Sequence, residues 1–150
     1  EVLIFGDSDD YFSDNRIESS LSALNNNDIV VNDVSLFDDS GIYETMYMSN
    51  RLKDNSKISF EYIQNKNIFG LSNTAIKLDI LEEVVFDEDL VAVDWYLYKG
   101  LLKNRSNAVF INKAITYYRQ YKNNTIGLQV VDGKYYFWWE QKNGEMNEVN

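Results

Sequence analysis

The first part of the chain alternates between strand and helix patterns, and this alternation limits the folds that it can adopt. Residues 2–5 form an uninterrupted apolar run, typical of a strand buried on both faces at the centre of a sheet. Ile17, Leu21 and Leu24 then recur at helical spacing and predict a helix. Residues 28–34 are rich in branched side chains and predict a second strand. Strand, helix and strand in this order predict a parallel α/β sheet.

The rest of the chain predicts shorter elements. Helices are expected near residues 56–67, 79–83 and 91–103, and strands within residues 70–76, 108–111 and 115–118. The aromatic block at residues 135–139 is expected in the core or on a covered face, with stacking on sugar rings as the alternative. The chain has no internal repeat and no linker rich in Pro, Gly or Ser, so one domain is expected over residues 1–150.

The residue types that are missing narrow the possible chemistry. The 150 residues include no Cys, His or Pro, and the formal net charge is −10. Disulfides, thiol nucleophiles, Cys/His zinc sites and catalytic triads that contain His are therefore excluded. The acidic excess argues against a nucleic-acid partner, because such proteins neutralise phosphates with Lys and Arg. Chemistry must rest on carboxylates, hydroxyls, amides, Lys and Arg, or on a hard metal ion bound by the carboxylates.

The first candidate site is the acidic loop, the segment Asp7-Ser8-Asp9-Asp10 that directly follows the apolar strand. Ligands bind at the carboxyl ends of strands in open α/β sheets. Two Asp residues at this spacing can direct oxygens toward one Mg²⁺ or Mn²⁺ and leave room for substrate phosphates. Two other interpretations stay open: an acidic turn that caps the next helix at Ser13 or Asp14, and a phosphatase of the haloacid-dehalogenase kind, which also begins with a strand and D-x-D.

Two further side chains are candidates on local grounds. Asp94 lies near the start of the predicted helix at residues 91–103, where the helix dipole stabilises its anion. Partial burial would raise its pKa toward that of a general base for a sugar hydroxyl; the alternative is an Asp that only favours helix formation. Arg119 ends a predicted strand and could hold a phosphate or a carboxylate bidentately, or else pair with a surface acid.

Four segments, in this order, resemble the second half of a family 2 glycosyltransferase with the GT-A fold. They look like the family's metal-binding D-x-D, its glycine-containing strand before the acceptor site, the segment that supplies the catalytic base, and its closing Tyr-Arg motif. The segments are Asp7-Ser8-Asp9-Asp10-Tyr11-Phe12 with Asn15-Arg16-Ile17, Gly70-Leu71-Ser72-Asn73-Thr74-Ala75-Ile76, Phe86-Asp87-Glu88-Asp89-Leu90 through Asp94-Trp95-Tyr96-Leu97, and Ala114-Ile115-Thr116-Tyr117-Tyr118-Arg119-Gln120 with Asn123-Asn124-Thr125. The resemblance extends over most of residues 1–128.

The resemblance implies an α/β fold with a GT-A-like (Rossmann-like) mixed sheet flanked by helices, truncated at its N-terminus. Residues 1–128 would form the family-like core and residues 129–150 a C-terminal extension. The implied activity is metal-dependent, inverting transfer of a sugar from a nucleotide-sugar to a hydroxyl of a glycan or lipid-linked acceptor. The implied roles are Asp94 as catalytic base, Asp7 and Asp9 as ligands of Mn²⁺ or Mg²⁺, and Asp10, Gly70, Asn73, Trp95 and Arg119 as substrate-binding residues.

The chain also departs from the family pattern. Tyr121 occupies the position where the family often has His, and Val93 occupies that of an acid before the base, so Asp87, Glu88 and Asp89 remain stand-ins for Asp94. The nucleoside-binding half, roughly ninety residues in a doubly wound sheet, is absent. We therefore expect this chain alone to be inactive, with a missing N-terminal half or a second copy as its partner, in the cytoplasm or at the inner face of the membrane. The alternative is a non-catalytic remnant of the fold that binds sugar or protein.

Overall fold

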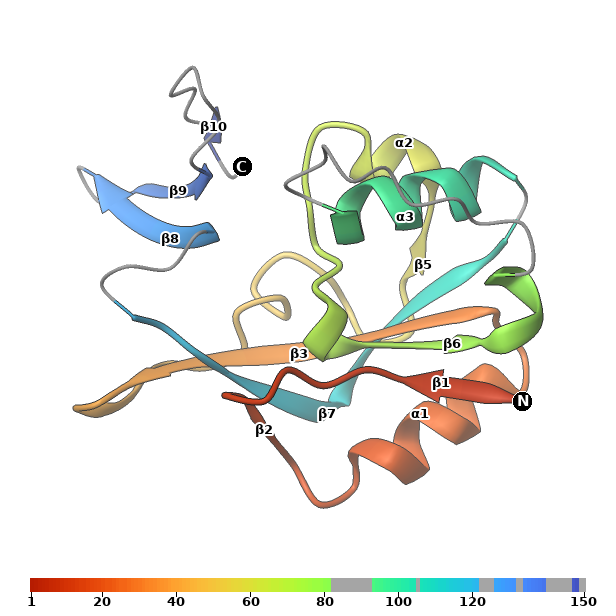
Figure 1. Cartoon of the computed structure of the whole chain (residues 1–150), viewed down its shortest axis with the longest axis horizontal. Coiled ribbons are helices and arrows are strands. Elements are labelled where there is room, and N and C mark those ends of the chain that lie inside the picture. Colours follow the sequence, from red (N-terminus) through yellow and green to blue (C-terminus); the bar gives the residue numbers. More distant parts are fainter. Residues whose placement is uncertain (82–92, 105, 122–125, 132–133, 140–146, 149–150) are drawn as a thin grey trace.

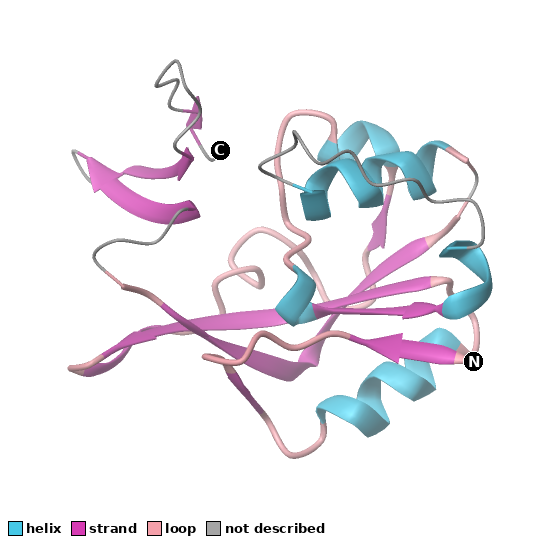
Figure 2. Ribbon diagram, viewed as in Figure 1, coloured by secondary structure: helices cyan, strands magenta, loops and turns pink. Residues whose placement is uncertain are grey.

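Five strands form a strongly curled, mixed sheet in the order β1-β6-β3-β7-β2 (Figures 1 and 2). The computed structural model describes residues 1–81, 93–104, 106–121, 126–131, 134–139 and 147–148, with side chains up to residue 121. The strands are β1 (Val2–Ile4), β2 (Tyr11–Phe12), β3 (Ile29–Asp38), β6 (Thr74–Lys77) and β7 (Ala108–Arg119), with β4 (Gly41–Glu44) paired to β3 and β5 (Lys57–Ile58) paired to β7. Among the strands of this sheet that the structure describes, β3 and β7 pair in parallel and the other pairs are antiparallel.

Helices cover both faces of this sheet (Figure 1). The helices are α1 (Arg16–Leu24), α2 (Phe60–Ile63) and α3 (Val93–Lys103), with the 3₁₀ turns η1 (Leu71–Asn73) and η2 (Leu78–Leu81) at the two ends of β6. The side chains of β3 alternate between the faces, because Ile29 and Val31 pack in the cluster that includes α3, whereas Val30 packs against Leu24 of α1. None of the helices that the structure describes is both long and apolar enough to cross a membrane.

The expected α/β class is confirmed, but the position of the first strand is not as predicted. The apolar run at residues 2–5 was expected at the centre of a sheet, whereas β1 is half-exposed and lies at one end of the strand order. The antiparallel strand β6 lies between β1 and β3, so the first strand–helix–strand unit is not a contiguous parallel pair. The sheet curls into a half-barrel and does not have a clear Rossmann form. The sequence predicted a strand within residues 70–76, but not that this strand, β6, inserts between β1 and β3, because that pairing joins residues far apart in the chain.

Helix α1 forms where predicted but buries a different face. Ile17 and Leu21, which set the helical period, remain 63% and 45% exposed. The buried residues of α1 are Arg16, Ser20 and Leu24, a row at spacings of four. Arg16 can be buried on this face because its guanidinium donates hydrogen bonds to the Asn32 side chain and to the Phe5 carbonyl.

Several other elements differ in length from the prediction. The helix expected at residues 56–67 is shortened to α2, and β5 occupies its first turn. The two strands expected at residues 108–111 and 115–118 are one strand, β7, with a register shift opposite Asn32. Helix α3 matches its prediction from residue 93 on and buries Leu97 and Leu101. Residues 86–90 of the resemblance, with the stand-in acids, lie outside the described residues.

The C-terminal residues form a second, three-stranded antiparallel sheet in the order β10-β9-β8. Its strands are β8 (Ile126–Val131), β9 (Lys134–Trp139) and β10 (Asn147–Glu148). The aromatic block at residues 135–139 belongs to β9. The expected limit between the family-like core and the C-terminal extension, after residue 128, lies within β8.

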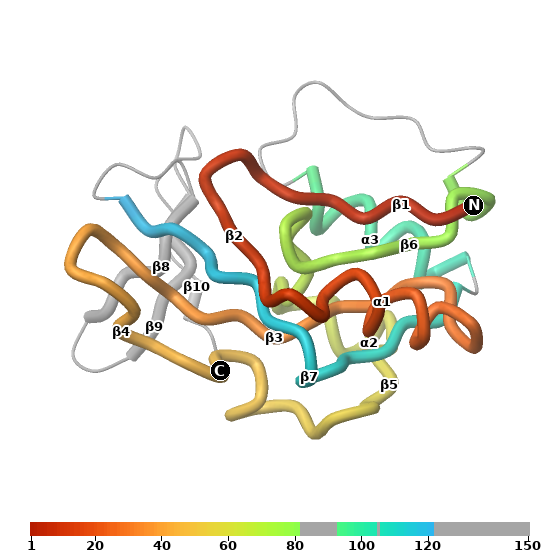
Figure 3. The backbone as a smooth tube through the Cα atoms, turned by 90° about the horizontal axis from the view of Figure 1, so that it is seen from below, coloured from red at the N-terminus to blue at the C-terminus, as the bar shows by residue number. Residues whose placement is uncertain are grey.

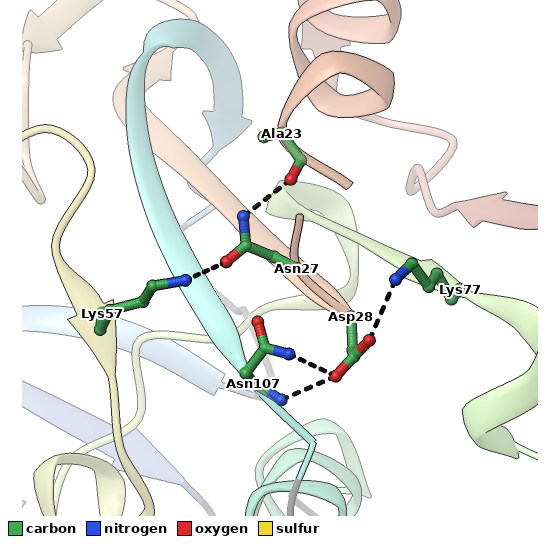
Figure 4. A network of polar contacts seen from close by, with 6 residues as sticks. All are labelled: Ala23, Asn27, Asp28, Lys57, Lys77 and Asn107. Carbon is green, nitrogen blue, oxygen red and sulfur yellow. Dashed lines mark hydrogen bonds and ion pairs between the residues drawn. The ribbon is translucent and has the colours of Figure 1, made fainter. Parts of the chain in front are cut away.

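A polar network joins the strands at the end of the main sheet where β3 begins (Figure 4). The carboxylate of Asp28 accepts hydrogen bonds from the backbone N–H and the side-chain amide of Asn107, at 3.0 and 2.6 Å, and pairs with Lys77 at 3.1 Å. Asn27 donates to the Ala23 carbonyl and accepts from Lys57. These contacts fix the starts of β3 and β7 and the end of β6 relative to one another.

A buried carboxylate also fixes the segment that follows β4. Asp33 of β3 is buried, and its Oδ1 accepts hydrogen bonds from the backbone N–H groups of Val34 and Met48, both at 2.9 Å. Its Oδ2 accepts from the hydroxyl of Ser49. A buried carboxylate that accepts several hydrogen bonds is strongly held, and removing it leaves those donors unsatisfied.

We expect Asp33→Ala to lower the free energy of unfolding by about 2–4 kcal/mol, because buried N–H groups at Met48 and Ser49 lose their acceptor. Urea denaturation followed by circular dichroism measures this loss. Asp79→Ala, which removes an exposed carboxylate of η2, is the matched control and should change stability by less than about 0.5 kcal/mol. Equal effects of the two substitutions would contradict the role assigned to Asp33.

Candidate functional site

The acidic loop crosses from one edge of the curled sheet to the other. Strand β1 pairs with β6, whereas β2, which follows the loop, pairs with β7 at the opposite end of the strand order (Figure 3). Only residues 5–10 separate β1 from β2, and a segment of that length spans at most about 25 Å. The acidic loop therefore connects the two outer strands of the curled sheet directly.

Hydrogen bonds hold the acidic loop to both edges. The backbone N–H of Asp7 donates to Ser72 Oγ at 2.9 Å, in the turn η1 that precedes β6. On the other side, Asp10 Oδ1 accepts from the backbone N–H of Arg119 at 2.9 Å, and Arg119 Nε donates to the Asp9 carbonyl at 3.3 Å. The loop is thus fixed by contacts with residues more than sixty positions away in the sequence.

A buried guanidinium supports the loop from beneath. Arg16 is only 4% exposed; its Nη2 donates to the Phe5 carbonyl at 2.6 Å and its Nε donates to Asn32 Oδ1 at 3.2 Å. Its guanidinium also lies 4.0 Å from the centre of the Phe12 ring. Gly6 packs directly on that ring, since an added Cβ would lie 2.9 Å from Phe12 Cζ. Arg16 therefore fixes the chain just before and just after the acidic loop.

Burial lowers the pKa of Arg16 to about 10, and the nearby charge of Asp10 opposes that shift. Arg16 remains charged at neutral pH, so it places a positive charge behind a loop that carries three carboxylates. This arrangement offsets part of the repulsion among the acids. The acidic loop is therefore fixed both by geometry and by charge.

Asp94 of α3 reaches the same region from the helical layer. Burial raises the pKa of Asp94, and the charge of Asp7 raises it further, whereas the backbone N–H of Trp95, which donates to Asp94 Oδ1 at 2.7 Å, lowers it. An electrostatic effect of Asp7 on Asp94 requires the two carboxylates to be neighbours in the fold. The expectation that the acidic loop and Asp94 face a common site thus has physical support.

The side chain of Tyr118 lies on the same face of β7 as Thr116, whose hydroxyl donates to the Ser72 carbonyl at 2.9 Å. Tyr118 is half-buried on β7, and burial raises its pKa to about 12, with further contributions from the charges of Asp10, Asp7, Asp9 and Asp94. The three acids of the loop and the acid of α3 therefore all act on one hydroxyl group. We call these four carboxylates and Tyr118 the acid cluster.

The acid cluster includes Asp7 and Asp9, the two predicted metal ligands. Burial raises the pKa of Asp7, and the charge of Asp9 adds to this effect, so the two carboxylates repel each other. The Oδ2 atom of Asp10 is buried and accepts no hydrogen bond from the described residues. Repelling carboxylates and an unsatisfied oxygen suit a divalent cation. However, no group of three or more acids among the described residues is arranged to hold a metal, so Asp7 and Asp9 would form a two-carboxylate site open to substrate oxygens.

The other predicted substrate-binding residues make contacts within the protein. Gly70 donates its N–H to Asn73 Oδ1 at 2.8 Å, and Asn73, 3% exposed, donates to the carbonyls of Asn32 and Ile68. Trp95 Nε1 donates to the Ile63 carbonyl at 2.8 Å, which joins α3 to α2. The roles of Gly70, Asn73 and Trp95 toward a substrate stay predictions.

Arg119 lies on the opposite face of β7 from Tyr118. Its guanidinium is 4.4 Å from the centre of the Phe37 ring and pairs with the exposed carboxylate of Asp39 at 3.6 Å. The pairing with a surface acid, one of the two interpretations of Arg119, is thus present. Its backbone N–H and Nε also hold the acidic loop, so Arg119 contributes to the position of Asp10 whether or not it contacts a ligand.

Sequence patterns did not single out the residues that assemble the acid cluster. Arg16, Ser72 and Tyr118 all fall inside segments that carry the family resemblance, but no spacing rule separates them from their neighbours. Thr116, whose Oγ1 donates to the Ser72 carbonyl at 2.9 Å, is another example. The one available signal was Arg16, a charged residue in line with Leu24 on the predicted helix.

Compared with models of known protein families and with curated protein sequences, the chain matches none of them. The family resemblance therefore rests on the four segments themselves, and the geometry of the acid cluster is independent of it.

The raised pKa of Asp94 predicts that Asp94→Asn stabilises the protein at neutral pH. Below its ordinary value of 3.8 the carboxyl is protonated in both the folded and the unfolded protein; stability falls as the pH rises through the window between 3.8 and the raised folded pKa. At pH 7 the variant should unfold at a higher temperature, by about 2–4 °C for each kcal/mol gained. The difference from wild type should shrink as the pH is lowered toward 4.

Differential scanning calorimetry at several pH values measures this difference. Asp79→Asn, which removes an exposed carboxylate, should show no such pH dependence relative to wild type. A variant at Asp94 that is less stable than wild type at pH 7, or equally stable at every pH, would contradict the burial of a charged carboxylate at this position.

Proposed function

We propose that this chain carries the metal-binding and acceptor-activating part of an inverting glycosyltransferase of the GT-A kind. The enzyme would transfer a sugar from a nucleotide-sugar to a hydroxyl of a glycan or a lipid-linked acceptor. The observation that carries this proposal is the acid cluster: the acidic loop after β1 and Asp94 of α3, far apart in the sequence, act electrostatically on the same phenol. The fold class alone would not support this function, because one fold can carry many different functional sites.

Asp94 has the properties that a base for an acceptor hydroxyl needs. Burial raises its pKa, so the carboxylate takes up a proton more readily than an exposed Asp does. The backbone N–H of Trp95 holds one of its oxygens, which fixes the orientation of the carboxylate. An acceptor hydroxyl that loses its proton to Asp94 attacks the anomeric carbon of the donor sugar from the side opposite the leaving diphosphate, and this direct displacement inverts the configuration. Neither His nor Cys is required.

Asp7 and Asp9 are the residues that would hold Mn²⁺ or Mg²⁺. Both residues are exposed as a whole, the Asp7 carboxylate being partly buried, and hard divalent cations commonly take one or two protein carboxylates together with substrate phosphate oxygens. When bound, such an ion neutralises charge on the leaving diphosphate. Arg16 holds the loop in place from behind through the Phe5 carbonyl and Phe12. Asp10 is bonded to the backbone of Arg119 and keeps the end of the loop against β7.

The GT-A fold itself is part of this proposal. It is supported by an acidic loop at the carboxyl end of β1, by a mixed sheet, and by helices on both of its faces. Recognition of the nucleoside would come from an N-terminal half or from a second copy of the chain. Under this proposal the protein acts in the cytoplasm, at the inner face of a membrane when its acceptor is a lipid-linked saccharide.

A second function is favoured by two observations. No group of three or more acids among the described residues is arranged to hold a metal, and Asn73 and Trp95 bond to the protein's own backbone. A non-catalytic remnant of the same fold that binds sugar or protein fits both. Isothermal titration calorimetry with Mn²⁺ separates the two functions, because the remnant has no reason to bind the ion and the transferase requires it.

The transferase assignment predicts that Asp94→Asn lowers sugar transfer by about 10²- to 10⁴-fold, the usual contribution of a general base. The assay uses the native full-length protein with Mn²⁺ and a panel of nucleotide-sugars, and it follows both transfer to the acceptor and hydrolysis of the donor. Asp79→Asn is the matched control and should retain full activity. A fully active Asp94→Asn would overturn the assignment of the base, and a wild-type protein without any turnover would favour the remnant.

A further inference from the structure

The side chains at the end of β7 alternate between the two faces of the sheet. Thr116 and Tyr118 face the core and the acidic loop: Thr116 Oγ1 donates to the Ser72 carbonyl, and Tyr118 packs against the large core cluster. Tyr117 points to the other face, where its ring stacks on Tyr11 with 4.3 Å between the ring centres. Two adjacent tyrosines of one strand therefore occupy different environments, and only Tyr118 belongs to the acid cluster.

The backbone donors that reach the acid cluster are already engaged: the N–H of Trp95 donates to Asp94 and the N–H of Arg119 donates to Asp10. The four carboxylates of the cluster are acceptors only when they are ionised. Of the nearby hydroxyl groups, Thr116 donates to the Ser72 carbonyl, and Ser72 accepts from the backbone of Asp7. No hydrogen bond among the described residues engages the hydroxyl of Tyr118, and this atom is not one of the buried, unsatisfied ones. A phenol is neutral at physiological pH and carries one proton to donate. The Tyr118 hydroxyl is thus a donor that no described residue engages, on the face of β7 that carries Thr116.

Resting on the function proposed above, we infer that the Tyr118 hydroxyl donates a hydrogen bond to an oxygen of the diphosphate of the nucleotide-sugar. Tyr118 lies between Thr116, which is bonded to Ser72 beside Asp7, and Arg119, whose backbone N–H is bonded to Asp10, so its side chain leaves β7 next to the loop that would hold the ion and the diphosphate. Phosphate oxygens are acceptors and match this donor, whereas every carboxylate around it repels them. As the glycosidic bond to the donor breaks, negative charge grows on the diphosphate and the hydrogen bond becomes stronger.

The competing role for Tyr118 is internal: its hydroxyl could hold the carboxylates of the acidic loop rather than a ligand. The two roles differ in what they do to metal binding. A hydroxyl that positions Asp7 or Asp9 affects the affinity for Mn²⁺ itself. A hydroxyl that contacts the diphosphate leaves that affinity unchanged and affects only the binding of phosphate groups.

The test uses Tyr118→Phe, with Tyr117→Phe as the matched control. Each substitution removes one hydroxyl from adjacent positions of β7 and keeps the aromatic ring, so the packing on the core or on Tyr11 is retained. Thermal unfolding confirms that both variants remain folded. Calorimetry then measures the affinity for Mn²⁺ alone and, at saturating Mn²⁺, the affinity for inorganic pyrophosphate, a probe that carries the diphosphate without any nucleoside.

We expect Tyr118→Phe to weaken pyrophosphate binding about ten- to hundredfold, the loss for a hydrogen bond to a charged group, with no change in Mn²⁺ affinity. Tyr117→Phe should bind both like wild type. Unchanged pyrophosphate binding by Tyr118→Phe, equal losses in both variants, or a parallel loss of Mn²⁺ affinity would each overturn the inference and leave the proposed function standing. A wild-type protein that binds neither Mn²⁺ nor pyrophosphate would instead overturn the proposed function, and the inference with it.

Discussion

The buried guanidinium of Arg16 is the interaction on which the candidate site depends. It binds the carbonyl at the end of β1, the side chain of Asn32 in the central strand β3, and the ring of Phe12 in β2. These three elements surround the acidic loop, so the loop's position follows from one side chain beneath it. Arg suits this position better than Lys would, because its planar group donates in two directions and stacks on an aromatic ring at the same time.

The acid cluster is arranged at the expense of stability. Burial raises the pKa values of Asp7, Asp10 and Asp94, which means that their charged forms are less stable in the folded protein than in water. A chain selected for stability alone would replace at least one of these carboxylates with an amide. Acids with raised pKa values that are gathered at one place are typical of sites that bind or transform a ligand. The same charges therefore explain both the local instability and the chemistry that we propose.

The sequence was most informative where a pattern is local. The helical period located α1 and α3. It was least informative where the outcome depends on distant partners. The inward face of α1 is set by what Arg16 meets on β1 and β3, and β1 is an edge strand because β6 separates it from β3. Likewise, strand alternation predicts that Tyr117 and Tyr118 face opposite sides, but not which of them faces the acids.

The most direct test of the account is whether an ion held by the acidic loop lies beside both α3 and β7. Addition of Mn²⁺ to the ¹⁵N-labelled protein broadens the amide signals of residues near the ion. The account predicts early broadening at Asp9, Trp95 and Tyr118, with the signal of Asn107 unaffected, because Asn107 lies at the opposite end of β7, roughly 30 Å away along the strand. Broadening at Asp9 alone, or to the same degree at Asn107 as at Tyr118, would contradict it.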